Sequence, residues 1–540
     1  MPKLDWIGKD KVIMHHRDVP YRVLKTKYGY SAKDGLKAEG TKSKNMIIHG
    51  DNLVSLKALL PKYENGVDCI YIDPPYNTGN EKWVYNDNVN DPHIKKWINE
   101  VVGAEGEDLS RHDKWLCMMY PRLQLLRQLL KEENGVIFIS IDENEIYNLK
   151  LICDEIFGAH NFIGQWCWFK SATPPNLSYK IKRNIEYILC YEKSKNTIKY
   201  RGVKKSSPSD DPMIKPQNSI KTLTFPAGVL NVKLPDGVIK AGTYGTARYP
   251  NILLNDLIVE NGVNKNEVSF SNRFIWIQST LNEAIRSHTI LNCSKQLVLS
   301  YKRQEYDPEV PPNLIDISVG VNTTEEAGKE LTRIFNGQKV FDFPKDVSLI
   351  EYLLNFSCPK DGVILDSFAG TGTTAHAVLN LNKKDGGNRS FILTELMDYA
   401  DSLTAERVKR VISGYGEKEG TGGDFNYYEL GEPLFNDKET LNESIPIHDI
   451  REYIFYSETR HSLPSGTQSS PYFLGAFNNT GYYFYYEKEK QTTLDYNTLN
   501  IIIEKADSYV VYADVCLLSE DYMLKNNIVF KKIPRDIKQL

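Results

Sequence analysis

The stretch Ile70-Tyr71-Ile72-Asp73-Pro74-Pro75-Tyr76-Asn77-Thr78-Gly79 predicts a buried strand that runs directly into an acid, two prolines and an aromatic ring. Pro74 and Pro75 lack backbone N–H groups and hold φ near one value, so the strand ends at Asp73 and the turn is stiff. The turn gathers a carboxylate, a backbone carbonyl and a flat ring. Two acceptors and a stacking surface suit a planar exocyclic amine such as that of adenine or cytosine. The alternative is a plain strand end with a tyrosine cover.

A second strand, Val363–Asp366, leads into Ser367-Phe368-Ala369-Gly370-Thr371-Gly372-Thr373-Thr374 and then a helix. The two glycines let the backbone approach a ligand closely, and the first N–H groups of the helix can receive a carboxylate or phosphate. The chain has no lysine before the threonine pair, as a P-loop requires, and lacks the third glycine of the dinucleotide fingerprint.

The next strand, Ser390–Glu395, ends in an acid. Glu395 follows Gly372 by 23 positions. At this spacing an acid at a neighbouring strand tip meets ribose hydroxyls. The alternative for Glu395 is a solvated acid at a strand end.

These motifs together resemble the amino-methyltransferases of DNA. Asp73 to Tyr76 come first and Phe368 to Gly372 much later, which is the order of their permuted β class. Longer strings are similar to the modification subunits of type III restriction-modification systems, from about residue 46 to 200 and again from about 323 to the C-terminus. These strings are His49-Gly50-Asp51-Asn52, DPPYNTGN, DKWLCMMYPRLQLLRQLL, GVIFISIDENE, FDFPKD, FAGTGTTAHAV and NIVFKKIPRDI.

The resemblance implies S-adenosylmethionine as the cofactor. Its methionine part would lie at the glycine turn, its ribose at Glu395 and its adenine near Asp51, although Asp51 could simply cap a helix. Lys345 would lie near the methionine carboxylate, or else be a surface lysine. No metal is required, because the sulfonium already activates the methyl group and positioning carries most of the acceleration. The implied cofactor-binding set is Asp366, Phe368, Ala369, Gly370, Thr371, Gly372, Thr373, Glu395, Asp51 and Lys345.

The implied catalytic set is Asp73, Pro74, Pro75 and Tyr76. Asp73 and the Pro74 carbonyl would draw on the two hydrogens of the target amine, and Tyr76 would stack on a base extruded from the duplex. The family pattern associates an aspartate at the first motif position with adenine. The expected function is therefore a site-specific adenine-N6 DNA methyltransferase, the modification subunit of a type III-like system. The alternatives are a cytosine-N4 methyltransferase and a DNA-recognition scaffold subunit of a restriction complex.

The composition fits this interpretation. With 540 residues, 41% hydrophobic and 25% charged, the chain can form two to four domains with well-buried cores. Eight scattered cysteines, without a Cys-x-x-Cys pair or a zinc-like spacing, indicate reduced thiols. The chain shows neither an export signal nor a membrane-length apolar run. We therefore expect a cytoplasmic protein that binds no membrane.

Charge is unevenly distributed along a chain whose net charge is −4. Residues 165–250 hold fifteen Lys and Arg against five Asp and Glu, whereas 431–540 hold eleven against sixteen. A local basic excess is expected if one face follows a phosphate backbone, although a solvated basic surface would look the same. The expected partners are double-stranded DNA, a second copy in a homodimer, and a helicase-nuclease restriction subunit.

Alternation of strands and helices predicts an α/β fold: a permuted Rossmann-like methyltransferase sheet with an inserted target-recognition domain and a small α+β C-terminal domain. The insert reads as short strands without helical periodicity, and it could equally serve oligomerisation. We expect a mobile cover over 77–91, carrying Trp83 and Tyr85, and a helix over 499–506. The expected boundaries are 1–45 (extension on the core or DNA), 46–193 (catalytic half), 194–322 (target recognition), 323–430 (cofactor-binding half) and 431–540 (C-terminal domain, subunit contact).

Overall fold

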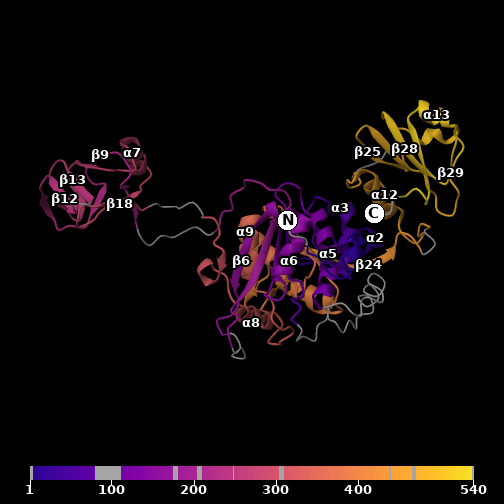
Figure 1. Ribbon diagram of the computed structural model, residues 1–540, viewed down its shortest axis with the longest axis horizontal. Coiled ribbons are helices and arrows are strands. Elements are labelled where there is room, and N and C mark those ends of the chain that lie inside the picture. Colours follow the sequence, from indigo (N-terminus) through magenta and orange to yellow (C-terminus); the bar gives the residue numbers. More distant parts are fainter. Residues whose placement is uncertain are drawn as a thin grey trace. The chain divides into compact units, whose positions relative to one another are not determined.

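A computed structural model describes residues 4–78, 111–173, 180–202, 210–246, 249–302, 309–436, 440–464 and 470–537. They form two units, one of Met1–Lys199 with Pro312–Leu540 and one of Tyr200–Pro311 (Figure 1). From Gly79 on, the cover expected over 77–91 lies outside the described residues, and so do Trp83 and Tyr85.

The first unit is built on a sheet of eleven strands in the order β19-β6-β7-β5-β4-β20-β21-β3-β24-β1-β2. Its six central strands are parallel, so their carboxyl ends meet at one edge. They are β5 (Val136–Ile141), β4 (Cys69–Ile72), β20 (Val363–Asp366), β21 (Ser390–Glu395), β3 (Met46–His49) and β24 (Asp424–Pro433). The flanking strands are β19 (Leu314–Ile315), β6 (Phe162–Phe169), β7 (Ile185–Glu192), β1 (Arg22–Ser31) and β2 (Gly35–Lys37).

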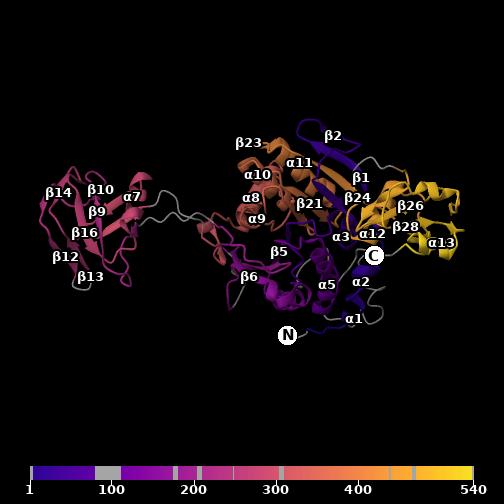
Figure 2. The ribbon, with the colours of Figure 1, turned by 90° about the horizontal axis from the view of Figure 1, so that it is seen from above.

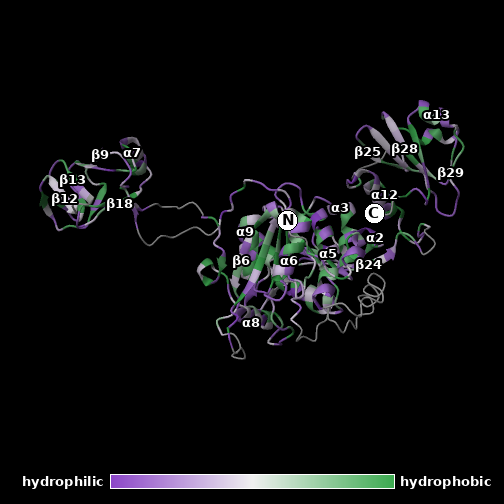
Figure 3. Ribbon diagram, viewed as in Figure 1, coloured by the Kyte–Doolittle hydropathy of each residue, from purple (hydrophilic) through white to green (hydrophobic). Residues whose placement is uncertain are grey.

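Strand β4 shows why this sheet is covered on both faces. Ile70 and Ile72 point into one apolar core and Cys69 and Tyr71 into the other, since successive side chains alternate across a strand. The first core is closed by α3 (Asn52–Tyr63), α5 (Arg111–Leu129) and α6 (Ile146–Cys153). The second is closed by α8 (Thr324–Ile334), α9 (Val347–Ser357), α10 (Thr373–Asp385) and α11 (Glu406–Ser413) (Figure 2). In Figure 3 the green stretches follow these helices and strands.

The catalytic half and the cofactor-binding half expected from the sequence meet where β4 pairs with β20. Cys69 lies opposite Ile364 and Ile70 opposite Leu365 in parallel register. The Asp68 carboxylate accepts a hydrogen bond from the Val363 N–H at 2.8 Å and so fixes the start of β20. These two strands, almost three hundred positions apart in the sequence, therefore end side by side.

The second unit has its own apolar core and consists mainly of short strands, as the Pro and Gly punctuation predicts. One sheet has the order β11-β14-β15-β10-β17-β18-β8 and the other β12-β13-β16-β9. The expectation that no helix occurs in this insert is wrong, because α7 (Gln278–Arg286) covers the core through Leu281 and Ile285, four residues apart. The strands are β8 (Asp211–Pro212), β9 (Lys221–Phe225), β10 (Leu230–Val232), β11 (Gly237–Ile239), β12 (Gly242–Thr246), β13 (Tyr249–Leu253), β14 (Leu257–Glu260), β15 (Val263–Asn264), β16 (Val268–Asn272), β17 (Ile290–Cys293) and β18 (Leu299–Lys302).

Residues 1–45 do more than extend from the core. After the short helices α1 (Lys9–Val12) and α2 (His15–Asp18), strand β1 pairs antiparallel with β24 and widens the main sheet. Tyr28 stacks on Tyr427 with ring centroids 5.0 Å apart. The mixture of Lys and Tyr in this segment masks the alternation of apolar and polar side chains that is typical of a strand near the edge of a sheet.

The C-terminal segment holds α12 (Ile447–Thr459) and a hairpin of β25 (Phe473–Phe477) and β26 (Thr480–Phe484). Strand β28 (Ser508–Ala513) lies parallel beside β26, and β30 (Ile528–Lys532) lies parallel beside β28. The helix expected over 499–506 is wrong. Only a 3₁₀ turn, Thr498–Ile501, forms there, because the β-branched run Ile501–Ile503 disfavours a helix. The α-helix lies later, at α13 (Glu520–Lys525).

In the described part of the chain no helix is long and apolar enough to cross a membrane. Within the same residues, no group of three or more His, Cys, Asp or Glu side chains is placed to hold a metal ion.

Candidate active site

The turn after β4 is fixed from both sides. Pro74 is buried, and the indole N–H of Trp115 on α5 donates to the Pro75 carbonyl at 2.7 Å. Asn77 adopts a left-handed backbone conformation with φ of 59° and donates to the Glu145 carboxylate. The backbone that carries Asp73 and Tyr76 is therefore held rigidly, as the two prolines predict.

Tyr76 folds back over Asp73 instead of pointing away. Its hydroxyl lies 2.8 Å from Asp73 Oδ1 and 3.1 Å from Glu186 Oε2, and its single proton can go to either oxygen. The Lys345 ammonium donates to the Tyr76 hydroxyl at 2.8 Å and lies 4.9 Å from the centre of its ring. The aromatic ring, the acid and the lysine thus form one group.

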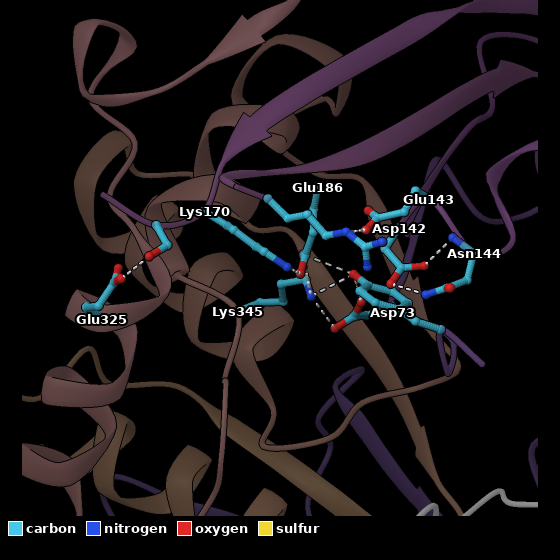
Figure 4. A network of polar contacts seen from close by, with 11 residues as sticks. Asp73, Asp142, Glu143, Asn144, Lys170, Glu186, Glu325 and Lys345 are labelled. Carbon is cyan, nitrogen blue, oxygen red and sulfur yellow. Dashed lines mark hydrogen bonds and ion pairs between the residues drawn. The ribbon is translucent and has the colours of Figure 1, made fainter. Parts of the chain in front are cut away.

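Lys345 stands between two carboxylates. Its Nζ lies 3.0 Å from Asp73 Oδ2 and 3.1 Å from Glu186 Oε2, while Lys170 contacts Glu186 Oε1 at 2.9 Å (Figure 4). Asp73 retains 28% side-chain exposure, against 10% for Glu186 and 11% for Lys345. The sequence-based expectation placed Lys345 toward the methionine carboxylate of the cofactor. In the structure its ammonium faces Asp73.

Burial and charge act in opposite directions in this network. Burial raises the pKa of Asp73, and Lys345 opposes that rise. For Glu186 burial also raises the pKa, but Lys345 and Lys170 together outweigh it and leave the pKa below the ordinary value. Beside them at the end of β5, burial raises the pKa of Asp142 to about 6 while Asn144 hydrogen bonds oppose it. Asp73 therefore depends on Lys345 to carry its negative charge.

The glycine turn lies at the neighbouring strand tip. Gly370 and Gly372 have φ of 51° and 80°, and a Cβ on Gly372 would lie 3.2 Å from the Thr404 carbonyl oxygen. Asp366 is buried. It accepts from the Phe368 N–H at 3.0 Å and from the Thr374 hydroxyl at 2.5 Å, so that it shapes the turn from beneath. Burial raises the pKa of Asp366 to about 7.

Glu395 closes the other side of the turn. Its Oε2 accepts from the Gly370 N–H at 2.7 Å and its Oε1 from the Met397 N–H at 3.0 Å. Each oxygen keeps a second lone pair with which to accept a ligand hydroxyl. Burial raises the pKa of Glu395 to about 7, against these two backbone hydrogen bonds. The sequence-predicted acid and glycine turn are thus in direct contact.

Asp51 lies at the start of α3. Its Oδ1 accepts from the Leu53 and Val54 N–H groups at 2.8 and 3.2 Å, which is the helix-cap alternative. Its Oδ2 lies 3.3 Å from Arg122. The next residue, Asn52, donates to the Ser367 carbonyl at 3.1 Å and so connects α3 to the tip of β20.

Three residues of the site escaped the sequence reasoning. Glu186 is an acid near the start of the otherwise mostly apolar strand β7, and that pattern was the available signal. Lys170 precedes it among many lysines, so nothing distinguished it. Arg407 on α11 lies behind the glycine turn, donating to the Thr371 and Thr373 hydroxyls at 2.6 and 2.8 Å. Arg407 lies in an amphipathic helix that also carries Lys409 and Arg410, so the sequence did not distinguish it as a site residue.

Comparison with known proteins identifies a family and several relatives of this chain. A family model described as DNA methylase matches residues 67–406. The Mod subunit of the type III restriction-modification enzyme StyLTI from Salmonella typhimurium is 32% identical over 467 residues, which are 82% of this chain and 67% of that subunit. The EcoP15I Mod subunit from Escherichia coli is 28% identical over 447 residues, which are 76% of this chain and 66% of that subunit. The chain thus spans about two thirds of the length of these relatives.

Two solved structures also match part of this chain. The PvuII DNA methyltransferase (cytosine-N4-specific) is 13% identical with a TM-score of 0.33, covering 68% of this chain and 86% of its own. The M1.HpyAVI–SAM complex is 14% identical with a TM-score of 0.29, and the match covers 67% of this chain and 98% of the M1.HpyAVI chain. The family match itself extends over more than half of this chain, from the strand before the Asp-Pro-Pro-Tyr turn to the helix behind the glycine turn. The chain therefore belongs to the DNA methylase family and is a DNA methyltransferase.

Proposed function

We propose that this protein transfers a methyl group from S-adenosylmethionine to the N6 amino group of adenine in double-stranded DNA. The observation that carries the proposal is the pairing of β4 with β20, which sets the Asp73 turn and the Gly370–Gly372 turn at neighbouring tips of one sheet. In sheets of this kind, ligands bind beyond the carboxyl ends of strands where the strand order reverses. One tip would receive the base and the other the methyl donor.

The Asp73 turn fits an exocyclic amine. The lone pair of such a nitrogen is delocalised into the ring, so it attacks poorly. Asp73 and the Pro74 carbonyl are both acceptors, and hydrogen bonds to the two N–H groups favour a pyramidal nitrogen with a directed lone pair. The Tyr76 hydroxyl can donate to Glu186 instead of Asp73, and it would then leave the Asp73 oxygen to the incoming amine while its ring stacks on the base.

The glycine turn fits the cofactor. S-adenosylmethionine would supply a methyl group already activated by its sulfonium. The open N–H groups at the start of α10, which has no side-chain cap, suit a carboxylate, and the free lone pairs of Glu395 suit ribose hydroxyls. Asp366, Phe368, Ala369, Thr371 and Thr373 would line this pocket. Asp51 would lie toward the adenine while still capping α3.

The reaction needs no metal in this proposal, because the sulfonium sulfur gives up its methyl group and leaves as a neutral thioether, which requires no Lewis acid. The methylated amine loses one of its protons. Methyl transfer should therefore continue at an unchanged rate after exhaustive dialysis against EDTA. Loss of activity that Mg²⁺ restores, with DNA binding unaffected, would contradict this part.

The choice of base is tested by product analysis. Purified protein, radiolabelled S-adenosylmethionine and duplex DNA are incubated, and the DNA is digested to nucleosides. We expect N6-methyladenine, which Asp73→Ala abolishes. Asp at the first motif position and the similarity to type III Mod subunits favour adenine. N4-methylcytosine as the sole product would overturn the choice of base while leaving the site assignment in place.

The second unit, Tyr200–Pro311, would read the DNA sequence. It folds around its own core, and its first part, residues 200–250, belongs to the stretch 165–250 that carries an excess of ten positive charges. Basic side chains would position the unit on the phosphates while a few others reach base edges. The bases it reads depend on which side chains enter a groove, and modified-base sequencing of DNA from expressing cells would identify the site and strand together.

The names of the relatives further suggest a partner. The StyLTI and EcoP15I proteins are Mod subunits of type III restriction-modification enzymes. We expect this chain to form a homodimer, measurable by light scattering, and to co-purify with a helicase-nuclease subunit. The alternative is a DNA-recognition scaffold in which methylation is secondary. It predicts that Asp73→Ala still protects DNA against the cognate nuclease although no methyl group is transferred.

A further inference from the structure

Arg407 is a buried cation without a counter-ion in contact. Its side chain is almost completely excluded from solvent, and in the described part of the chain no carboxylate lies within ion-pair distance of its guanidinium. Nη1 donates to the Thr371 and Thr373 hydroxyls, Nη2 lies 3.3 Å from His376 Nδ1, and Nε has no partner among the described atoms. Burial lowers the pKa of Arg407 only to about 10, so it stays charged at neutral pH.

The groups around Arg407 do not supply the missing negative charge. Burial and the arginine itself hold the pKa of His376 well below its ordinary value, so the imidazole is neutral. The nearest acids act only through space and are engaged elsewhere. Glu330 is paired with Arg333 and Lys418, and Asp346 caps α9. A buried charge is costly unless it is paired, so this arginine needs an anion nearby.

The two threonines determine where that anion can lie. Because each hydroxyl accepts a hydrogen bond from the guanidinium, its own proton must point elsewhere. The two hydroxyl oxygens are 3.3 Å apart, and the Thr373 hydroxyl also lies 3.5 Å from the Lys345 carbonyl oxygen, to which it can donate. With the Thr373 proton directed there, the proton of the Thr371 hydroxyl is available to a ligand. Thr371 and Thr373 belong to the glycine turn and to the first turn of α10. The positive charge of Arg407 is thus presented to the turn through polarised hydroxyls and adjacent N–H groups.

We propose that Arg407 is a positioning residue for the methyl donor, which orients the Thr371 and Thr373 hydroxyls so that the glycine turn binds the carboxylate of the donor's amino-acid part. The proposal rests on the proposed function, because it assumes that S-adenosylmethionine binds at this turn. It adds a residue outside the glycine motif, and it assigns the carboxylate to this turn instead of to Lys345, whose ammonium is held by Asp73 and Glu186. Thr404, one helical turn earlier, supports the same geometry by donating to the Gly370 carbonyl at 2.5 Å.

The affinities for two ligands distinguish a positioning role of Arg407 from a purely structural one. S-adenosylhomocysteine carries the carboxylate, whereas 5′-methylthioadenosine has the same nucleoside and thioether but no amino-acid part. Calorimetric titration of Arg407→Met should show affinity for S-adenosylhomocysteine lowered roughly 10- to 100-fold, the range expected for one lost charge-assisted contact. Affinity for 5′-methylthioadenosine should be unchanged. Arg407→Lys, which keeps the charge, should recover part of the loss.

The control is Arg410→Met, three residues along the same helix, where Arg410 pairs with Glu406 at 2.7 Å. It should leave both affinities unchanged. If Arg407→Met does not fold, the double variant Thr371→Val and Thr373→Val removes the same hydroxyls and gives the same selective loss. Equal loss of both ligands in either variant refutes the proposal. Failure of the unaltered protein to bind either ligand refutes instead the proposed function on which it rests.

Discussion

Replacement of Lys345 by methionine tests the electrostatics of the site most directly. Methionine keeps an unbranched chain of similar length and removes only the ammonium that lies 3.0 Å from Asp73 and 3.1 Å from Glu186. Two buried carboxylates would then share the Tyr76 hydroxyl without the cation between them. We expect a loss of both folding stability and catalysis, each with a characteristic pH dependence.

The expected size follows from the burial of the three groups. Removing one partner of a buried ion pair costs about 3–5 kcal/mol. Asp73 is partly exposed, and Lys170 continues to neutralise Glu186 at 2.9 Å, so the lower end applies. The free energy of unfolding of Lys345→Met at pH 8 should therefore fall by about 3 kcal/mol.

The sign of the pH dependence is fixed by linkage. Burial already raises the pKa of Asp73 and Lys345 opposes that rise, so the variant raises it further. The folded variant then binds more protons than the unfolded chain, and its stability falls as pH rises through the folded-state pKa. In the unaltered protein the lowered pKa of Glu186 contributes stability above its unfolded pKa, which is lost as pH falls. The stability difference between the two proteins should therefore be largest at pH 8 and smaller at pH 5.

The assays are urea unfolding at both pH values and steady-state methyl transfer across the pH range. The higher pKa of Asp73 in the variant means that a larger fraction of this carboxylate is protonated at a given pH and has lost acceptor capacity, so kcat should fall and the rate profile should move to higher pH. The matched control is Lys170→Met, which contacts Glu186 but not Asp73 and should leave the rate profile in place. A raised KM for S-adenosylmethionine with unchanged kcat would refute this reasoning and show that Lys345 serves the cofactor carboxylate.

Four further predictions follow from the same geometry. Tyr76→Ala should lower kcat/KM for DNA roughly 10- to 100-fold in steady-state assays, since stacking contributes about 1–3 kcal/mol, whereas Tyr76→Phe should keep most of it. Because burial raises the pKa of Glu395 to about 7, calorimetry should show weaker S-adenosylmethionine binding at pH 6 than at pH 8, and Glu395→Gln should abolish this difference. Gly372→Ala, at φ of 80° and 3.2 Å from the Thr404 carbonyl, should lower urea stability by about 1–2 kcal/mol; an unchanged midpoint would contradict the strain. Replacing residues 200–311 with a short Gly-Ser linker should retain S-adenosylhomocysteine binding by calorimetry and eliminate sequence-specific gel shifts.

The sequence by itself determined the central strands and the two turns. Strands β20 and β21 begin and end where the apolar runs predict, because parallel strands buried on both faces are nearly continuous in hydrophobic residues. Prolines after β4 and glycines after β20 mark the ends of strands for local steric reasons, which a single sequence records. The order of the motifs was also sufficient to indicate the class of enzyme.

Only the tertiary structure decided which side chains meet at those tips. Lys345 and Glu186 reach Asp73 because strand order places β7 and the segment before α9 around one sheet edge, and no local pattern specifies that order. The same holds for Arg407 beneath the glycine turn and for β1 beside β24. Local propensity acts over a few residues, whereas charges and hydrogen bonds in a site join residues hundreds of positions apart, so their pairing emerges only when the chain has folded.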